Sequence, residues 1–551
     1  MRLNPVTSLL LAALMLSACG KPEPTAIKAA SAPVAAATSG AHAADGIAWR
    51  HASSDVDIDD AFALARTQSK PVFVYWGAAW CPPCNQLKAT LFNRQDFIAR
   101  SKAFVAVYID GDSPGAQKLG TRFKVRGYPT TVLFNPQGEE LTRLPGEVDA
   151  AQYTQLLTLG MNAQRPVKAV LAAAQQPTAA AQLSANDWKL LAFYSWETDE
   201  QQVVDKAQLP ALLTQLAQAC PAGESDTATR LMLKAVAAVS SVEKSAPPQN
   251  QHRERVMKLL ADPVASRSQM DVLTNNAADL VRGLSAAKSN ERTALVGSFN
   301  TALKALEADT TLSRADRLTA LSARVALAKI DDAKPVEKAN AKPAIPEALQ
   351  AEVRAHVAAA DRDITDGYER QAVITSAADV LEQAGLLPES TTLLESNLSK
   401  SHSPYYLMSG LASNAKKRGD IEGALRWSES AFTKSEGPAT RLQWGASFVK
   451  NLIELAPQDE ARIEKTVQQL FTEASAQPDA FYERSARSLQ RVGTQLQTWN
   501  KDKKHTAVVK RLQSQMTEIC GRLPAQAAAQ DTQRAACEAV FKPPAIDGKA
   551  A

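Results

Sequence analysis

Hydrophobic and polar positions follow two different periods along this chain. Between residues 47 and 162, short apolar runs alternate with stretches in which apolar residues recur at helical spacing. The predicted strands are 71–76, 104–109 and 130–134 with an edge strand before residue 143, and the predicted helices are 57–67, 81–91, 117–123 and 150–159. Strands that alternate with helices need a sheet covered on both faces, so this part is predicted to be an α/β domain.

From residue 163 to the C-terminus the apolar pattern is helical almost throughout. One set of apolar residues is spaced to share a single helical face: Met270, Leu273, Ala277, Leu280, Val281 and Leu284. A stretch rich in Lys, Pro and Ala, residues 331–346, interrupts the pattern and is predicted to be a linker. The remainder is therefore predicted to be two α-helical regions, 163–330 and 347–551.

An internal repeat with a period of 34 residues lies in the second helical region. Gly385 matches Gly419, Leu387 matches Ile421, and Pro404 matches Pro438, with further matches between Leu393 and Trp427, Leu398 and Phe432, and Lys400-Ser401 and Lys434-Ser435. This period, with small residues before the glycines, resembles tetratricopeptide repeats. The resemblance implies an all-α, TPR-like solenoid, in which each helix pair buries a face against the next pair.

The first 46 residues are not expected to belong to the fold. The apolar run 9–16 follows Arg2 and is too short to span a bilayer, so it is predicted to be an export signal. It ends in Leu16-Ser17-Ala18-Cys19, which resembles a bacterial lipobox. The resemblance implies a lipoprotein signal peptide over 1–18, lipidation of Cys19, and delivery to the outer membrane because Gly20 is not Asp. An ordinary secretory signal is the alternative, and residues 19–46 are predicted to hold the lipidated cysteine and a disordered tether.

Composition narrows the classes of function. Hydrophobic residues make up 45% and charged residues 22% of 551 residues, which is typical of a folded soluble protein with more than one unit. The formal net charge is +4, and no basic run is interleaved with aromatic residues. Nucleic acid is therefore not an expected partner, and the membrane is expected to be contacted through the lipid anchor only.

The chain has six cysteines, some of which can form disulfides: Cys19, Cys81, Cys84, Cys220, Cys520 and Cys537. Cys520 and Cys537 flank a helix-ending turn inside two helical stretches, so they are predicted to face each other across a helical hairpin as a structural disulfide. Such a bond would contribute roughly 3 kcal/mol if unstrained. Two separate buried thiols are the alternative, and Cys220 has no evident partner.

The strongest chemical signal is Trp80-Cys81-Pro82-Pro83-Cys84, where a predicted strand gives way to a helix. A thiolate attacks a disulfide, and a helix N-terminus stabilises the negative charge of a thiolate. Two intervening residues place Cys84 one turn on, where it can resolve a mixed disulfide. Prolines fit there because the first helical turn has no intrahelical partners for its N–H groups. This helix start is expected to expose the Cys81 sulfur and to turn Cys84 inward.

The same residues predict the direction of exchange. Pro82 and Pro83 lack N–H groups, so the Cys84 N–H and the helix dipole are the expected donors to the Cys81 sulfur. A pKa of Cys81 modestly below the free value of about 8.5 is therefore predicted, and with it a reductant rather than a strong oxidant. Zinc needs four ligands, and neither a second cysteine pair nor a histidine cluster accompanies the motif. No metal and no cofactor are predicted.

A second motif, Val125-Arg126-Gly127-Tyr128-Pro129-Thr130, precedes the third predicted strand. With the cysteine motif it resembles the thioredoxin superfamily over residues 47–162. The segment after Cys84 looks most like the C-terminal thioredoxin domain of the bacterial transmembrane thiol:disulfide interchange reductase. The resemblance implies a thioredoxin-like fold in which Cys81, Cys84 and a cis Pro129 carry the chemistry. It also implies that Trp80 and Tyr128 lie beside the substrate. The alternative is that both are ordinary aromatic residues of the core.

Two positions depart from the family pattern. The family places a buried Asp six residues before the first cysteine, as proton acceptor for the second, and this chain has Tyr75 there. A Lys that neighbours this Asp in the family is replaced by Ala106. The proton of Cys84 is therefore expected to pass to water or to another group.

The resulting expectation is a thiol:disulfide oxidoreductase of the cell envelope, lipid-anchored in the periplasm. It would reduce the disulfides of exported proteins, receive electrons from an upstream thiol reductant, and use its helices to bind a protein partner or to orient the redox domain. Three alternatives stay open: a helical-repeat interaction scaffold with an accessory redox domain, an oxidant or isomerase, and a structural cysteine pair.

Overall fold

A computed structural model describes residues 46–125, 127–242, 247–332, 345–523 and 532–542. The predicted signal peptide, Cys19, the tether as far as residue 45 and most of the predicted linker lie outside these residues. No helix within the described ranges has the length and apolar character needed to cross a membrane.

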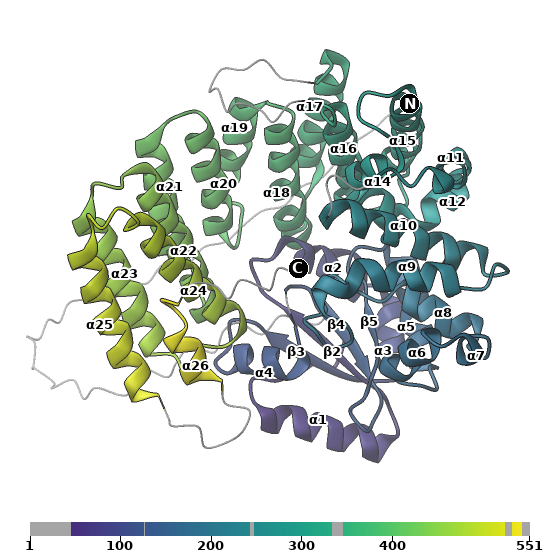
Figure 1. Ribbon diagram of the computed structural model, residues 1–551, viewed down its shortest axis with the longest axis horizontal. Coiled ribbons are helices and arrows are strands. Elements are labelled where there is room, and N and C mark those ends of the chain that lie inside the picture. Colours follow the sequence, from purple (N-terminus) through teal and green to yellow (C-terminus); the bar gives the residue numbers. More distant parts are fainter. Residues whose placement is uncertain (1–45, 126, 243–246, 333–344, 524–531, 543–551) are drawn as a thin grey trace, which may run out of the picture. The chain divides into compact units, whose positions relative to one another are not determined.

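A five-stranded mixed sheet lies in the N-terminal part of the described chain (Figure 1). Its strands are β1 (Arg50–His51), β2 (Val72–Gly77), β3 (Val105–Asp110), β4 (Thr130–Phe134) and β5 (Glu140–Leu144). They are arranged in the order β1-β3-β2-β4-β5. β2 pairs parallel with β3 and antiparallel with β4, and β4 pairs antiparallel with β5. The predicted α/β fold is confirmed, and β1 was missed because two residues are too few to show a period.

Helices cover both faces of the sheet, as the alternating pattern predicts. They are α1 (Asp55–Gln68), α2 (Pro82–Leu87), α3 (Gln95–Ser101), α4 (Ala116–Phe123) and α5 (Ala150–Met161). The side chains of β2 alternate, since Val74 packs in the cluster with α1 and α4 whereas Phe73 packs in the cluster with α2, α3 and α5. The helix predicted over 81–91 is shorter, because α2 ends at Leu87 and a π-helical turn, Lys88–Phe92, follows it.

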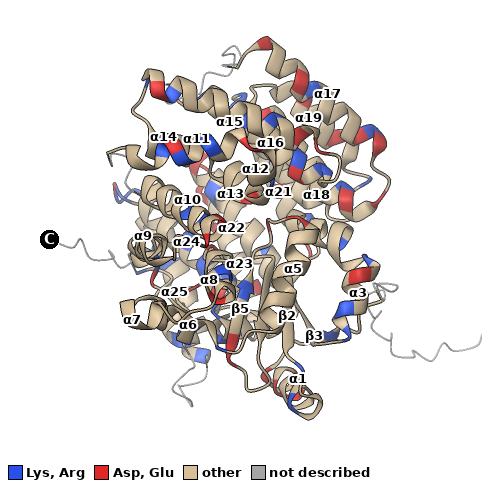
Figure 2. Ribbon diagram, turned by 90° about the vertical axis from the view of Figure 1, so that its right-hand side faces the viewer, with Lys and Arg blue, Asp and Glu red and all other residues tan. Residues whose placement is uncertain are grey.

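The rest of the described chain is mostly helical, as predicted. Its α-helices are α6 (Val167–Ala174), α7 (Pro177–Ala180), α8 (Ala185–Ala192), α9 (Leu209–Ala219), α10 (Ser225–Val242), α11 (Arg253–Ala261), α12 (Pro263–Ser268), α13 (Met270–Asn275), α14 (Ala277–Leu284), α15 (Asn290–Ala308), α16 (Arg314–Ala328), α17 (Glu347–Asp363), α18 (Gly367–Gln383), α19 (Leu387–Asn397), α20 (Pro404–Lys417), α21 (Ile421–Lys434), α22 (Pro438–Leu455), α23 (Glu460–Ser475), α24 (Glu483–Trp499), α25 (Thr506–Arg522) and α26 (Gln533–Glu538). Lys, Arg, Asp and Glu are interspersed over these helices (Figure 2).

The single helical face predicted across 270–284 is wrong. The six apolar residues are all buried, but two helices, α13 and α14, present them, and the chain leaves helical geometry at Asn276 with φ −120°. Asn has a low helix propensity, and its side chain competes for backbone groups. Here the Asn276 side chain donates to the carbonyl of Val272 at 3.3 Å.

Helix starts in the second helical region follow the 34-residue period. α19 begins at Leu387 and α21 at Ile421, while α20 begins at Pro404 and α22 at Pro438. Gly385 and Gly419 precede corresponding helices and share a positive φ, 80° and 76°, which favours glycine. Consecutive helices from α18 to α23 pack against one another. The repeat is therefore a structural unit of two helices.

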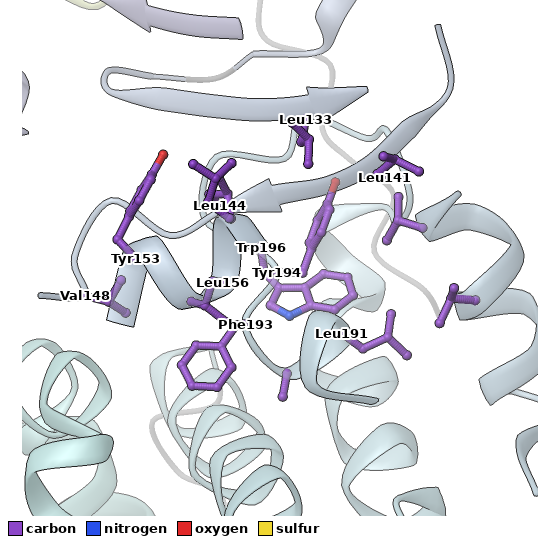
Figure 3. Packing of buried hydrophobic residues seen from close by; sticks show 14 of the residues in the cluster. Leu133, Leu141, Leu144, Val148, Tyr153, Leu156, Leu191, Phe193, Tyr194 and Trp196 are labelled. Carbon is purple, nitrogen blue, oxygen red and sulfur yellow. The ribbon is translucent and has the colours of Figure 1, made fainter. Parts of the chain in front are cut away.

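One hydrophobic core runs across the predicted domain boundary at residue 162. Leu144 of β5 and Leu156 of α5 belong to the same cluster as Leu191 of α8 (Figure 3). Trp188 of α8 is a further member of this cluster. Arg143 extends this connection, because its buried guanidinium donates to the carbonyl of Thr198 at 2.7 Å and pairs with Glu140. The first helices of the helical region thus complete the core of the α/β domain.

Candidate active site

Cys81 is the N-cap residue of α2, at the end of a loop that leaves strand β2. Its sulfur accepts a hydrogen bond from the Cys84 N–H at 3.2 Å, and Pro82 and Pro83 occupy the first turn. This is the donor pattern predicted from the two prolines. Cys81 and Cys84 are joined by a disulfide.

Asn85, which sequence reasoning missed, holds the loop before Cys81. Its side-chain amide is buried and donates to the carbonyls of Ala79 and Cys81, each at 2.8 Å. An Asn in the first turn of a helix commonly bonds nearby backbone groups, so its position after Cys84 was the available signal.

The Tyr128–Pro129 peptide bond is cis. Strand β4 begins one residue later, and its Thr130 pairs with Trp76 on β2. Pro129 therefore lies at the sheet edge from which the cysteine loop departs. Tyr128 packs against the small buried cluster of Ala78, Cys81 and Cys84, and its ring lies 6.3 Å from that of Trp80. The five residues predicted for catalysis and substrate contact come together at this edge.

Tyr75 occupies the position where the resemblance implies a buried acid. Its ring is buried and stacks on Tyr108 with 5.2 Å between centroids, and it packs against Phe92. Ala106 lies in the same core cluster. Aromatic packing has therefore replaced the acid–lysine pair.

A different carboxyl, Asp110, lies at this edge of the sheet. It ends β3 and pairs with Gly77, the last residue of β2 before the cysteine loop. Burial raises the pKa of Asp110 above its ordinary value, and the nearby charge of Asp112 adds to the rise. Carboxyls with a raised pKa are common where protons are exchanged, so Asp110 joins the candidate site.

Helices from the second helical region cover the cysteine pair. Trp80 stacks on Tyr406 of α20, with 5.7 Å between ring centroids, and its carbonyl accepts a hydrogen bond from Gln371 of α18. α2 packs against α18 and α4 packs against α24 (Figure 1). As a result Cys81 is only 2% exposed, and Cys84 is 0% exposed. The expectation of an exposed Cys81 is wrong, because it considered the helix start without its distant neighbours.

A cavity of about 360 Å³ reaches Cys81 from between the α/β domain and these helices. Trp80, Pro82, Pro83, Gly127 and Tyr128 line one side, and Tyr406, Gln443, Arg484, Arg487 and Arg491 line the other. Its volume falls in the range of small-ligand sites. Within the described ranges, no cluster of three or more potential metal ligands is present.

Cys220, Cys520 and Cys537 do not line the cavity at Cys81. Cys520 of α25 and Cys537 of α26 form a disulfide, and both are buried. Cys220 is a buried free thiol, and burial raises its pKa to about 11. A thiol with that pKa is protonated at neutral pH and is a poor nucleophile. Cys19 lies outside the described residues.

Comparisons with known proteins concern the α/β part. The thioredoxin-like domain family matches residues 58–160, which include both cysteines of the pair and Pro129. The thiol:disulfide interchange protein DsbD 1 of Pseudomonas aeruginosa is 31% identical over 107 residues, covering 19% of this chain and 18% of that protein. A thioredoxin-like protein of Synechocystis is 38% identical over 88 residues, covering 16% of this chain and 79% of that protein.

The solution structure of a thioredoxin from Thermus thermophilus is 28% identical, covers 20% of this chain and 85% of that chain, and has a TM-score of 0.18. The chain spans less than a fifth of the length of the interchange protein it matches.

Proposed function

Because this chain belongs to the thioredoxin-like proteins, we propose that it is a thiol:disulfide oxidoreductase of the cell envelope that reduces the disulfides of exported proteins. One observation carries the proposal: the Cys81–Cys84 disulfide lies at a helix N-terminus beside Tyr128 and the cis Pro129. The name of the interchange protein supports thiol:disulfide exchange, and the resemblance of residues 16–19 to a lipobox supports the envelope. In this proposal Cys19 is lipidated and the protein is anchored at the periplasmic side of the outer membrane.

The reaction needs no cofactor. The Cys81 thiolate attacks one sulfur of the substrate disulfide, forms a mixed disulfide, and releases the other sulfur as a thiolate that takes up a proton. Cys84 then loses its proton and attacks the Cys81 sulfur, which forms the Cys81–Cys84 disulfide and releases the second substrate thiol. Two electrons and two protons pass from the dithiol to the substrate. An upstream dithiol reductant returns them by the reverse exchange at Cys81.

Trp80 and Tyr128 are the proposed substrate contacts, because both pack against the cluster that contains Cys81. Pro129, which follows Tyr128 through the cis bond, is proposed to act with Cys81 and Cys84 in catalysis. The helical region, proposed to be a TPR-like solenoid, orients the redox edge and carries a surface for a protein partner. The Cys520–Cys537 bond is proposed to be structural, since it joins α25 to α26 away from this edge. An interaction scaffold is less well supported, because the helices cover the cysteine pair directly.

Exchange by the isolated protein tests this function. The protein is reduced, freed of reductant and mixed with bis(2-hydroxyethyl) disulfide, and its oxidation is followed by mass. We expect wild-type protein and Cys220→Ser to be oxidised alike, and Cys81→Ser to be inert. Cys220→Ser is the matched control because that thiol is also buried but lies outside the motif. Oxidation of Cys81→Ser at the wild-type rate would contradict the assignment.

A Cys84→Ala variant tests the substrate class in the native compartment. Without the resolving thiol, mixed disulfides on Cys81 persist and can be identified. We expect exported proteins among the trapped partners. Recovery of Cys81 only as a free thiol, in cells where the variant is exported, would argue against this substrate class.

A further inference from the structure

The cavity at Cys81 has a strongly basic wall supplied by one helix. Arg484, Arg487 and Arg491 lie three and four residues apart on α24, so they project from one helical face. Each of them lines the cavity that Cys81 also lines. The lining residues, all of them described, include no Asp or Glu.

These arginines differ in how far their charges are neutralised. Arg487 pairs with Glu483 at 2.7 Å. Arg484 lies over the Trp80 ring, 4.4 Å from its centroid, and its Nε donates to Gln443. Both terminal nitrogens of Arg484 are buried and have no hydrogen-bond partner within the described structure. Buried donors normally have a hydrogen-bond partner, so the terminal nitrogens of Arg484 can donate to an acceptor on a molecule bound in the cavity.

Arg491 stands at the exposed end of this wall. Its pKa is lowered, first by partial burial and then by repulsion from Arg484 and Arg487. The positive charges therefore crowd one another, and a nearby anion would relieve the repulsion. A guanidinium matches a carboxylate with two parallel hydrogen bonds, which gives this pairing direction as well as charge.

A neighbouring cavity provides a contrast. It has a volume of about 410 Å³ and also touches Pro82 and Pro83, but its lining includes Asp379 and Glu382 and not Cys81. Tyr406 and Trp444 line it as well. Of these two cavities, the one that reaches the reactive sulfur is the basic one.

We propose that the basic cavity is the substrate site, and that it takes disulfides that carry a carboxylate close to the sulfur atoms. The inference rests on the proposed exchange activity and adds its substrate class. Cys81 is 2% exposed, so the disulfide must enter the cavity as a small molecule or as an extended segment with an acidic residue beside its cysteine. The carboxylate binds Arg484, Arg491 guides it inward, and the Cys81 thiolate attacks the adjacent sulfur. The bonds formed and broken, and the two electrons passed, are those of the exchange described above.

Three small disulfides of different charge test the inference: 3,3′-dithiodipropionate, bis(2-hydroxyethyl) disulfide and cystamine. Because their leaving thiols differ in pKa, each rate is divided by the rate of the same disulfide with 2-mercaptoethanol. The rate at which each oxidises the reduced full-length protein is measured at low salt and at high salt. Clefts lined by one sign of charge raise association rates by about tenfold or more. We expect the dianion to react about tenfold faster than the neutral disulfide and the dication to react slowest, with the differences reduced by salt.

Variants locate the effect. Arg484→Gln and Arg491→Gln should each lower the preference for the dianion at least about threefold, whereas Arg484→Lys should retain part of it. Arg511→Gln is the matched control, because it removes the same charge from an exposed arginine paired with Glu464 on α23. Circular dichroism and thermal melting confirm folding, and Arg491→Gln serves if Arg484→Gln does not fold. The pKa of Cys81 in each variant separates substrate binding from thiolate stabilisation, because rates are then compared per thiolate.

Two peptide disulfides, with Glu or Lys beside the cysteine, distinguish the source of the carboxylate. Preference for the Glu peptide supports an acidic protein segment, and preference confined to dithiodipropionate supports a small acidic disulfide. Equal rates for all charges, with exchange intact, would overturn the inference and leave the proposed function standing. If no disulfide oxidised the reduced protein, the neutral one included, the proposed function itself would be overturned.

Discussion

Asp112 caps a helix that lies more than three hundred residues further along the chain. Its carboxylate accepts hydrogen bonds from the backbone N–H of Thr440 at 2.8 Å and from the Thr440 hydroxyl at 2.6 Å. Thr440 lies in the first turn of α22, whose N-cap residue is Gly437. A side chain at Gly437 would meet the Asp112 carboxylate, since an added Cβ would lie 2.5 Å from its Cγ. The α/β domain thus supplies the cap that this helix lacks.

Loss of this cap should weaken the packing of the second helical region over Cys81. We expect Asp112→Ala to cost about 1 kcal/mol, the usual cost of a lost N-cap. If alkylation requires the cover to open, the rate of iodoacetamide labelling of reduced Cys81 should rise about fivefold. Asp502→Ala is the control, because Asp502 pairs with Lys504 at an exposed position. Equal labelling rates in wild type and Asp112→Ala would contradict the role of this contact.

Asp110 should make stability depend on pH. Its pKa is raised in the folded protein, so the unfolded chain ionises first and stability falls as pH rises above the ordinary value of 3.8. Asp110→Asn removes that cost and can still accept the hydrogen bond from the Asp112 N–H. We expect the variant to gain stability over wild type as pH rises from about 4 to 7, as measured by urea unfolding. A constant difference over this range would count against a raised pKa.

The α/β domain should depend on the helices that follow it. Residues 46–162 alone would expose the apolar face that packs on Trp188 and Leu191, and would leave Arg143 without its bond to Thr198. We expect residues 46–242 to unfold cooperatively in urea and residues 46–162 to aggregate or unfold at much lower urea. Equal urea midpoints for the two fragments would show that the shared core does not contribute to the stability of the α/β domain.

The Cys520–Cys537 bond should affect stability and not exchange. The pair encloses a short loop, for which the chain-entropy treatment gives about 3 kcal/mol. A double Cys→Ser variant should therefore melt at a lower temperature while it reacts normally with bis(2-hydroxyethyl) disulfide. Loss of exchange at a temperature where the variant is folded would assign this pair to the redox pathway.

Local signals predicted much of the fold and the centre of the site. Apolar runs located β2, β3 and β4, and the prolines at 82 and 83 placed Cys81 at a helix start with one backbone donor. These features depend on neighbours in the sequence, where spacing and propensity carry the information. The 34-residue period likewise predicted where repeated helices begin, because each unit has a glycine of positive φ before its first helix and a proline at the start of its second helix.

Contacts between distant segments were not predictable from one sequence. The backbone N–H of Gln117 donates to the carboxylate of Asp479 at 3.0 Å across 362 positions, and the stack of Trp80 on Tyr406 also joins segments that are far apart in the sequence. No period or motif in one of these segments identifies its partner in the other. The cover over Cys81 and the basic wall from α24 therefore emerged only with the structure. The broken helix at Asn276 had a weak signal, two successive Asn residues, that the apolar period outweighed.

The burial of Cys84 constrains the order in which reactants are bound and released. Because Cys84 is fully enclosed and Cys81 adjoins the basic cavity, the sulfur proposed to attack the substrate is also the one that the electron donor must attack. Donor and acceptor therefore compete for one position and cannot bind there together. Turnover should follow ping-pong kinetics, with parallel double-reciprocal plots and inhibition of each half-reaction by an excess of the other reactant.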